Sequence, residues 1–333
     1  MLRKLIKTPR GYLSYIRNVR GLKTLSSYTD VLFCNWPFAV GFIPVPNVNK
    51  NILIDSFNWS IDNGFIEEDA SIHAAMSLLG FYEKKNILNS ILFPAKVPEL
   101  IDLTNKNILS LPIDKFKKNI LDNYVTYSFP TAEKYVDGVY PIVNSLELLH
   151  QMFDVGAKII QLRVKKNQFE KIDQLVQRCC KLAIKYPDSK LFINDHWQLA
   201  IDNGAFGVHL GQEDLFNAEM KSIKNSGLHL GLSSHSYWEV SRAVRYKPSY
   251  IACGPIFPTM AKMMPWITQG VQNLRYWARV LDVPTVAIGG ISLSNLRTIK
   301  KSNCTGVSII GEIVNNKDPS ESFKTLEFNW KKS

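Results

Sequence analysis

The sequence predicts an α/β protein built on a (β/α)8 TIM barrel, preceded by a smaller, mostly helical N-terminal region. From about residue 138 onward, eight short apolar runs alternate with segments of helical periodicity. The earlier part of the chain lacks this alternation. Eight near-equal strand–helix units favour a closed barrel over a doubly wound open sheet, which rarely needs so many units.

Each of the eight apolar runs is short enough to be a strand. The runs are 139–143, 158–162, 190–193, 206–210, 228–232, 250–253, 285–288 and 306–310. Between them, segments whose apolar residues recur at helical spacing are predicted to be helices. Examples are 145–155, 169–185, 197–203, 271–280 and 295–301.

Residues 1–137 are predicted to be an N-terminal extension, and residues 138–333 to form the barrel domain. Two segments, 52–63 and 66–80, have helical periodicity and meet at Asn63 and Gly64, which predicts a helical hairpin. The region lacks an obvious catalytic motif, so we expect it to be noncatalytic.

The composition is that of an ordinary globular protein: 333 residues, 46% hydrophobic and 21% charged. No apolar run approaches the ~18 residues that a membrane span needs, so we expect no membrane partner. The net charge of +11 is spread along the chain without an aromatic-rich basic motif, and we expect no nucleic-acid partner. A positive balance suits substrates that carry phosphates. The five cysteines show no CxxC spacing and are expected to be buried thiols in a reducing compartment.

The first 23 residues hold seven Lys or Arg and no acidic residue. A basic amphipathic helix, a targeting presequence and a solvated arm all fit this pattern, and we favour the arm. We expect a cytoplasmic protein, with organellar targeting left open as the alternative. The sequence is compatible with a monomer and with a homo-oligomer.

Polar residues or glycines stand at the ends of seven of the predicted strands. In a closed parallel barrel the active site lies at the carboxyl ends of the strands, so these residues are the candidates for it. They are Gln161, Arg163 and Lys165; Asn194 and Asp195; Gln212 and Asp214; Ser233, Ser234 and His235; Gly254, Thr259 and Lys262; Gly289 and Gly290; and Gly311.

Asp195 and Asp214 are 19 residues apart and follow consecutive strands. A strand–helix–strand crossover would place both carboxylates on the same rim, where a divalent metal can relieve their repulsion. The alternative is that Asp195 caps the next helix and Asp214 is a loop residue. With a metal present, the nearby cations Arg163, Lys165 and Lys262 would bind a polyanion such as pyrophosphate.

The glycines after the last two strands occupy the usual position of a barrel phosphate site. Two anion sites would suggest two phosphorylated substrates. A tight turn at Gly289 and Gly290 is the alternative. His209 is interpreted as pointing into the barrel wall, and His235 as a structural or loop residue.

In order and spacing, these motifs resemble those of the thiamine-phosphate synthase family over about residues 138–315. The matching segments are QLRVK at 161–165, ND at 194–195, GVHLGQEDL at 207–215, GLSSH at 231–235, GPIFPT at 254–259 with Lys262, and VAIGGIS at 286–292. The resemblance implies a Mg²⁺-dependent transferase that joins 4-amino-2-methyl-5-hydroxymethylpyrimidine pyrophosphate to hydroxyethylthiazole phosphate. The products would be thiamine phosphate and pyrophosphate.

The resemblance also implies roles for individual residues, each carried over by its place in a motif. Those implied to bind the pyrimidine pyrophosphate are Gln161, Arg163, Lys165, Asn194, Ser233 and Lys262, and Leu162 and Val164 are implied to bind substrate between them. Those implied to bind the thiazole phosphate are Thr259, Met260, Ala261, Gly290, Ile310 and Gly311. Asp195 and Asp214 are implied to ligate Mg²⁺. Arg163, Lys165, Lys262 and Ser233 are the implied catalytic residues, because they would stabilise the departing pyrophosphate.

Two positions depart from the family pattern, and both fall on the thiazole side. Ala261 stands where the family often has threonine, and Gly311 where it often has serine. A thiazole tautomerase-like isomerase and a noncatalytic phosphate-ligand binder on the same barrel are the alternative functions. Residues 52–80 faintly resemble a helical part of hydroxymethylpyrimidine phosphate kinase, so the N-terminal extension is interpreted as a degenerate remnant of that enzyme.

Overall fold

The computed structural model describes most of the barrel and part of the N-terminal region. The described residues are 3–16, 30–36, 40–45, 48–78, 82–83, 93–94, 101–102, 127–164, 172–258 and 268–332. They form two compact units. The first comprises residues 1–127 together with 236–246, and the second comprises residues 128–235 and 247–333.

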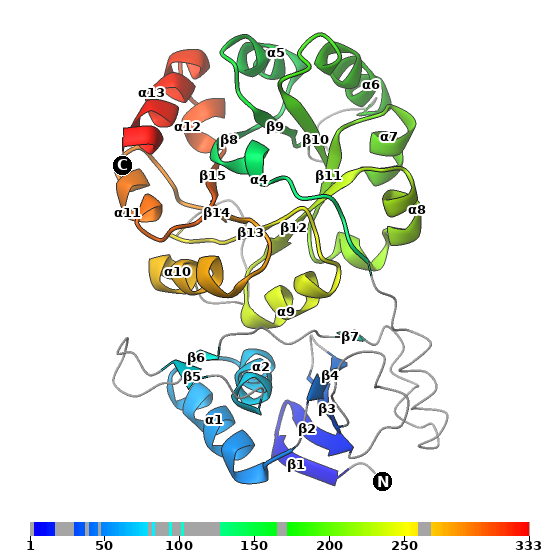
Figure 1. The fold of residues 1–333 in the computed structure, drawn as a ribbon, viewed down its shortest axis with the longest axis vertical. Coiled ribbons are helices and arrows are strands. Elements are labelled where there is room, and N and C mark those ends of the chain that lie inside the picture. The colour runs from blue at the N-terminus through cyan, green and yellow to red at the C-terminus, as the bar shows by residue number, and fades with distance from the viewer. Residues whose placement is uncertain are drawn as a thin grey trace. The chain divides into compact units, whose positions relative to one another are not determined.

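The second unit contains a closed barrel of eight parallel strands, as predicted, which neighbour one another in chain order (Figure 1). The strands are β8 (Gly138–Val143), β9 (Ile159–Leu162), β10 (Lys190–Asn194), β11 (Gly207–Leu210), β12 (His229–Ser234), β13 (Tyr250–Cys253), β14 (Thr285–Ile288) and β15 (Gly306–Ile309). All eight predicted strands are confirmed, and β12 extends two residues further than predicted, so that Ser233 belongs to the strand.

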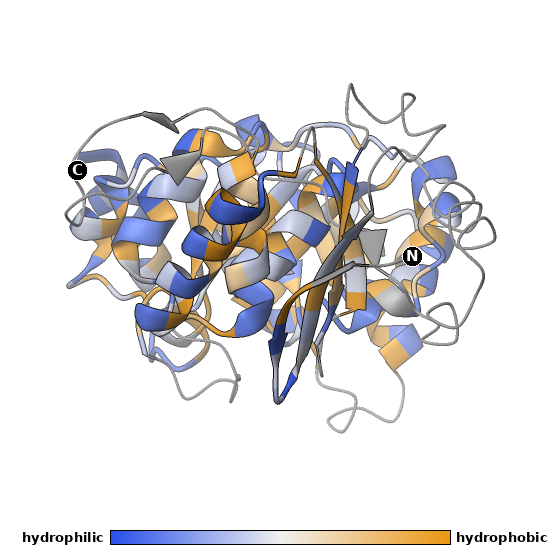
Figure 2. Cartoon of the chain, turned by 90° about the horizontal axis from the view of Figure 1, so that it is seen from below, coloured by the Kyte–Doolittle hydropathy of each residue, from blue (hydrophilic) through white to orange (hydrophobic). Residues whose placement is uncertain are grey.

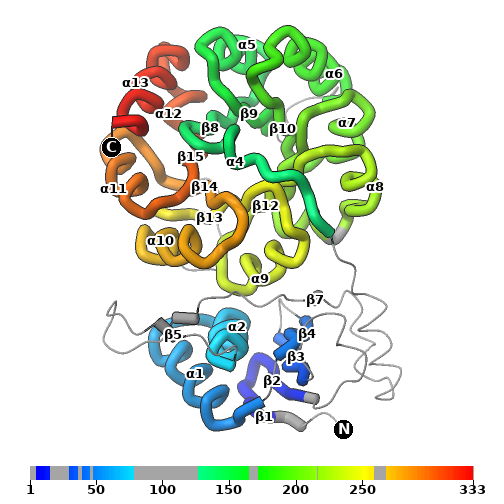
Figure 3. Tube along the Cα trace, viewed as in Figure 1, coloured from blue at the N-terminus to red at the C-terminus, as the bar shows by residue number. Residues whose placement is uncertain are grey.

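Helices alternate with the strands around the barrel, as the chain trace shows (Figure 3). They are α5 (Leu146–Asp154), α6 (Ile172–Ala183), α7 (Trp197–Asp202), α8 (Met220–Asn225), α10 (Gly270–Val280), α11 (Leu296–Lys300), α12 (Gly311–Val314) and α13 (Pro319–Lys332), with the 3-10 helix η3 (Asp214–Phe216) after β11. Figure 2 shows that apolar and polar residues are intermixed along the helices of the chain, as expected of helices that bury one face.

The short helix α4 (Glu133–Val136) closes the amino-terminal end of the barrel. Ala132 and Val136 belong to the same buried cluster as Tyr140 and Phe192 of the barrel strands. The Ala132 N–H donates to the carbonyl of Ser249, just before β13, at 3.1 Å. This end is therefore filled with packed side chains, which leaves the opposite rim as the place for a site.

The first unit contains an antiparallel sheet in the order β1-β2-β3-β4-β7. Its strands are β1 (Arg3–Thr8), β2 (Gly11–Ile16), β3 (Asp30–Asn35), β4 (Val40–Val45) and β7 (Ile101–Asp102). Helices α1 (Lys50–Asp62) and α2 (Glu67–Leu78) form the predicted helical hairpin, and β5 (Tyr82–Glu83) pairs with β6 (Phe93–Pro94). All five cysteines of the chain are buried, with free thiols.

The sheet corrects the prediction of a mostly helical N-terminal region. The stretch 33–45 contains two prolines, which are disfavoured within strands, and Pro37 lies outside the described residues. Pro44 lies in β4 beyond Gly41 and Phe42, the two residues that pair with β7. A proline is tolerated where its missing N–H interrupts no ladder hydrogen bond.

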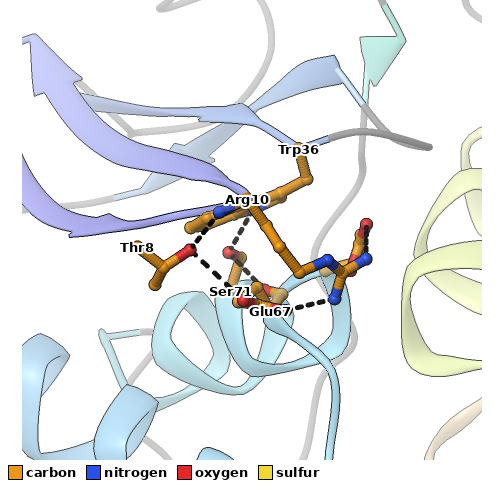
Figure 4. Close-up of polar contacts among 6 residues, drawn as sticks. Thr8, Arg10, Trp36, Glu67 and Ser71 are labelled. Atoms are coloured by element: carbon orange, nitrogen blue, oxygen red, sulfur yellow. Dashed lines mark hydrogen bonds and ion pairs between the residues drawn. The ribbon is translucent and has the colours of Figure 1, made fainter.

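The basic N-terminal segment is also not the solvated arm that we favoured, at least over residues 3–16. These residues form the β1–β2 hairpin, which pairs with β3. Arg10, at the turn of the hairpin, forms ion pairs with Glu67 and with the buried Glu68 of α2 (Figure 4). Trp36 donates its indole N–H to Ser71 of the same helix at 2.9 Å.

Helix α9 (Tyr237–Arg245), which lies between β12 and β13 in the sequence, belongs to the first unit. The buried carboxylate of Asp69 in α2 accepts the backbone N–H of Trp238 at 2.9 Å, at the first turn of α9. Burial raises the pKa of Asp69 to about 7. Among the described helices, none is long and apolar enough to cross a membrane.

Candidate functional site

The carboxyl ends of the eight barrel strands meet at one rim, and the described candidate residues lie at that rim. Gln161 and Leu162 end β9, and Arg163 and Val164 follow directly. The others are Asn194 at the end of β10, Asp195 after it, Asp214 at the start of η3, Ser233 in β12, Gly290 after β14, and Ile310 and Gly311 after β15. Lys165, Thr259, Met260, Ala261 and Lys262 lie outside the described residues, so their placement stays a prediction.

The alternation along β9 separates the candidates on 161–164 into two groups. Gln161 is buried, and its amide lies 3.5 Å from the Tyr140 hydroxyl in the barrel interior. Arg163 is two residues further along and half-buried, so its side chain follows the same face. Leu162 and Val164 are buried on the opposite face. Those two residues can meet a ligand at the rim through their backbone only.

The two acidic candidates flank the end of β11. Asp195 has a left-handed backbone with φ of 62°, and its N–H donates to the carbonyl of His209 at 2.9 Å. A positive φ is uncommon outside glycine, and such backbone strain is concentrated at functional sites. A Cβ atom on Gly211 would lie 3.0 Å from Asp214 Oδ2, so the Asp214 carboxylate lies against the backbone that leaves β11.

In the described part of the chain, no group of three or more His, Cys, Asp or Glu residues is arranged to hold a metal ion. Two carboxylates at one rim form a different kind of donor set. Mg²⁺ in proteins is commonly held by one or two carboxylates, with waters and substrate phosphates as its other ligands. The oxygen donors of Asp195 and Asp214 suit that mode of binding.

A chain of buried polar side chains crosses the barrel interior and ends at Ser233. The Tyr250 hydroxyl lies 3.0 Å from that of Tyr140 and 2.8 Å from His209 Nδ1. His209 Nε2 lies 2.8 Å from Ser233 Oγ. Burial, helped by the positive charge of Arg163, lowers the pKa of His209 to about 3, so its ring is neutral at physiological pH.

The interpretation of His209 as a wall residue is therefore wrong, because its ring lies in the barrel interior. The strand period carried a signal for this, because it places His209 on the same face as Gly207. In the structure that face is the interior one, since a Cβ atom at Gly207 would lie 2.4 Å from the Phe192 ring in the core. The partners Tyr140 and Tyr250 come from distant strands, and the sequence reasoning missed both.

The glycines after β14 form a turn that needs them. Gly289 and Gly290 have φ of 93° and 65°. A Cβ atom on Gly290 would lie 2.8 Å from the carbonyl oxygens of Phe257 and Pro258. The tight turn is thus real, and it brings the exposed backbone at Gly290 close to the loop after β13.

Two further contacts join neighbouring loops of the rim. The Gln212 amide donates to the carbonyl of Ser233 at 2.5 Å. The Gln269 amide donates to the carbonyl of His235 at 2.6 Å. The loop that carries Asp214 is consequently tied to the end of β12, which carries Ser233, through the buried amide of Gln212.

Comparison with known proteins agrees with this architecture. The family model described as thiamine monophosphate synthase matches residues 139–313. The thiamine-phosphate synthase of Proteus mirabilis (strain HI4320) is 45% identical over 200 residues, covering 60% of this chain and 92% of the relative. That of Serratia proteamaculans (strain 568) is 43% identical over 190 residues, covering 57% and 89%.

A solved structure of thiamine phosphate pyrophosphorylase from Pyrococcus furiosus is also similar, with a TM-score of 0.53 and 25% identity. The similarity covers 60% of this chain and 98% of that one. More than half of the chain matches the family model, and the matched part is the barrel that carries the candidate site. The chain therefore belongs to the thiamine monophosphate synthase family.

Proposed function

We propose that the barrel joins 4-amino-2-methyl-5-hydroxymethylpyrimidine pyrophosphate to hydroxyethylthiazole phosphate at its carboxyl-terminal rim, using Mg²⁺. The protein is a thiamine-phosphate synthase, a transferase of thiamine biosynthesis, as its family indicates. The pyrimidine pyrophosphate would lie over β9 to β12, and the thiazole phosphate beside the loops after β14 and β15. A cytoplasmic location and the choice between monomer and homo-oligomer remain predictions.

The observation that carries this proposal is the convergence of unlike polar groups on one rim. A cation (Arg163), an amide (Asn194), a hydroxyl (Ser233) and two carboxylates (Asp195 and Asp214) come from four consecutive strands or the loops that follow them. The opposite end of the barrel is filled by α4. A pyrophosphate with its metal needs this combination of cations and acidic oxygen ligands.

The proposed reaction breaks the bond between the pyrimidine methylene carbon and pyrophosphate, and the bonding electrons leave with the pyrophosphate. The thiazole nitrogen then donates its lone pair to that carbon. When bound, Mg²⁺ held by Asp195 and Asp214 would offset the charge that builds up on the leaving group. Arg163, together with Lys165 and Lys262, would stabilise the same charge.

The proposed step requires no general base, because the thiazole nitrogen carries no proton when it attacks. His209, the buried histidine nearest the rim groups, suits such a site because its lowered pKa keeps it uncharged. We therefore assign no acid–base pair and treat catalysis as preorganised charge stabilisation.

The metal assignment is tested by replacing one carboxylate by its amide. Asp195→Asn keeps the shape of the side chain and removes its charge, so we expect thiamine phosphate formation to fall by ~10²-fold or more. The matched control is Asp202→Asn, the same change on the exposed face of α7. If Asp195→Asn keeps activity comparable to that of Asp202→Asn at every Mg²⁺ concentration, the metal assignment is refuted.

We further propose that residues 1–137 take no part in the chemistry. In this proposal the described residues of that region serve to pack α2 and the antiparallel sheet, with Asp69 bonded to the start of α9. Full-length protein carrying Trp36→Phe, which removes the indole N–H bonded to Ser71, should keep the KM for both substrates. A changed KM for either substrate would give the region a role in binding.

A further inference from the structure

The hydrogen-bonded side chains inside the barrel form a continuous chain from Gln161 to Ser233, and the direction of its bonds would determine which nitrogen of His209 carries the proton. Its five side chains come from five different strands, and all but Ser233 are buried. In order they are Gln161, Tyr140, Tyr250, His209 and Ser233. Groups shielded from water must satisfy their hydrogen-bonding capacity with one another.

The amide nitrogen of Gln161 can only donate, so the Tyr140 oxygen accepts from it at 3.5 Å. Either hydroxyl of the Tyr140–Tyr250 pair, 3.0 Å apart, can be the donor, and we take Tyr140 as the donor to the Tyr250 oxygen. The Tyr250 proton is in turn directed to His209 Nδ1 at 2.8 Å. Burial raises the pKa of both tyrosines, so both hydroxyl protons remain in place to make these bonds.

This direction determines the tautomer of His209. A neutral imidazole whose Nδ1 accepts a hydrogen bond carries its proton on Nε2. The Nε2–H then donates to Ser233 Oγ, 2.8 Å away. Since Ser233 accepts this bond, its own hydroxyl proton is directed elsewhere. Ser233 is half-buried at the rim, so the remaining direction available is toward the site.

We propose that His209 is a positioning residue, which holds the Ser233 hydroxyl so that its proton points toward the diphosphate of the pyrimidine substrate. This inference rests on the proposed function, which assigns Ser233 to that substrate. His209 itself does not touch the reacting atoms. Tyr250 and Tyr140 select its tautomer. The Tyr250 ring also stacks on the His209 ring, with centroids 5.6 Å apart, and this contact limits rotation of the imidazole.

The tautomer can be observed without an activity assay. We expect nitrogen NMR of the wild-type protein with ¹⁵N-labelled histidine to show His209 as the Nε2–H tautomer, in the free protein and with Mg²⁺ and inorganic pyrophosphate added. His209→Gln identifies the resonance. Tyr250→Phe should abolish the preference, because Nδ1 then has no donor. A His209 that is protonated on Nδ1, or charged, would overturn the proposal.

Kinetics test whether His209 acts through Ser233. We expect His209→Asn to raise the KM for the pyrimidine pyrophosphate about tenfold, equivalent to ~1.4 kcal/mol, and to leave the KM for the thiazole phosphate unchanged. His209→Gln should recover most of this loss, since a glutamine amide reaches the position of Nε2. In protein that already carries Ser233→Ala, adding His209→Asn should not raise the KM for the pyrimidine pyrophosphate any further. Additive losses would show that His209 acts independently of Ser233 and would overturn the proposal.

Two controls keep the outcomes separate. His150→Asn makes the same replacement on the exposed face of α5 and should leave both KM values unchanged. If His209→Asn does not fold, Tyr250→Phe replaces it in the cycle with Ser233→Ala and should show the same lack of additivity. An inactive wild-type protein would refute the proposed function, whereas active protein with additive variants would refute the positioning role alone.

Discussion

Gly231 of β12 lies against the side chains of Tyr250 and His209, so Gly231→Ala is a direct perturbation of the polar chain. The added methyl would lie 2.3 Å from Tyr250 Cζ, 2.4 Å from its hydroxyl oxygen and 2.6 Å from His209 Nδ1. Non-bonded atoms prefer ~3.5 Å or more, so at least one ring must move by about 1 Å. Tyr250 is fully buried and His209 nearly so, which leaves little space for that movement.

The expected loss of stability has two parts. Overpacking a core by a methyl group typically costs ~1–3 kcal/mol. Stretching the bond of 2.8 Å between Tyr250 and His209 leaves buried polar groups poorly paired, which costs a further ~1–3 kcal/mol. Together they predict a loss of about 2–6 kcal/mol, a large part of the ~5–15 kcal/mol that stabilises a typical domain.

Urea unfolding of the purified protein, followed by tryptophan fluorescence, measures this loss. The matched control is Gly311→Ala, where the nearest heavy atom to the new methyl is 3.9 Å away, so its free energy of unfolding should change little. Gly231→Ala should also reduce the fraction of His209 in the Nε2–H tautomer. A loss of stability under about 0.5 kcal/mol, the usual range for an innocuous surface change, would refute the packing described around Gly231.

Three further predictions concern helix α4 at the amino-terminal end of the barrel, the first unit, and the proposed site for the thiazole phosphate. Gly306→Ala would place a methyl 1.8 Å from the carbonyl oxygen of Val136, so urea unfolding should show a loss of ~1–3 kcal/mol or displacement of α4. The pKa of Asp69 is raised from 3.8 to about 7 by burial, so its contribution to stability is present below pH 4 and is lost as the pH rises through 7. Asp69→Asn should flatten this part of the stability profile in thermal melts between pH 4 and 8, while an unchanged slope would show that Asp69 is not its source. Ala261→Thr restores a hydroxyl common in the family and should lower the KM for the thiazole phosphate; an unchanged KM would show that the site does not use it.

The barrel was predictable because each of its strands can be recognised from a short continuous run of apolar residues. Each apolar run is bounded by polar residues, and the positions 250–253 and 285–288 agree with β13 and β14. The rim candidates followed from the same pattern, since a parallel barrel gathers the ends of all its strands at one edge. The location of Asp195 and Asp214 beside β11 needed no knowledge of distant contacts.

The sheet of the first unit and the partners of His209 were missed because they depend on contacts between residues far apart in the sequence. The sheet of the first unit pairs residues 12–16 with 31–35, and the prolines at 37 and 44 obscured the strand pattern of β3 and β4. His209 and Tyr250 are 41 residues apart, and Tyr140 and Tyr250 are 110 apart. Only closure of the barrel brings these side chains together, so the period of a single strand reveals the face of His209 but not its partners.

The central claim is the proposal that Asp195 and Asp214 would hold Mg²⁺ at the rim, where it would offset the charge of the departing pyrophosphate. The most direct measurement follows thiamine phosphate and released pyrophosphate together, in the wild type and in Asp195→Asn, as Mg²⁺ is titrated. We predict that the wild type forms the two products in equal amounts only when Mg²⁺ is present. Asp195→Asn should form both products far more slowly than the wild type. Equal rates for the two proteins, or product formed by the wild type after removal of divalent metal, would contradict it.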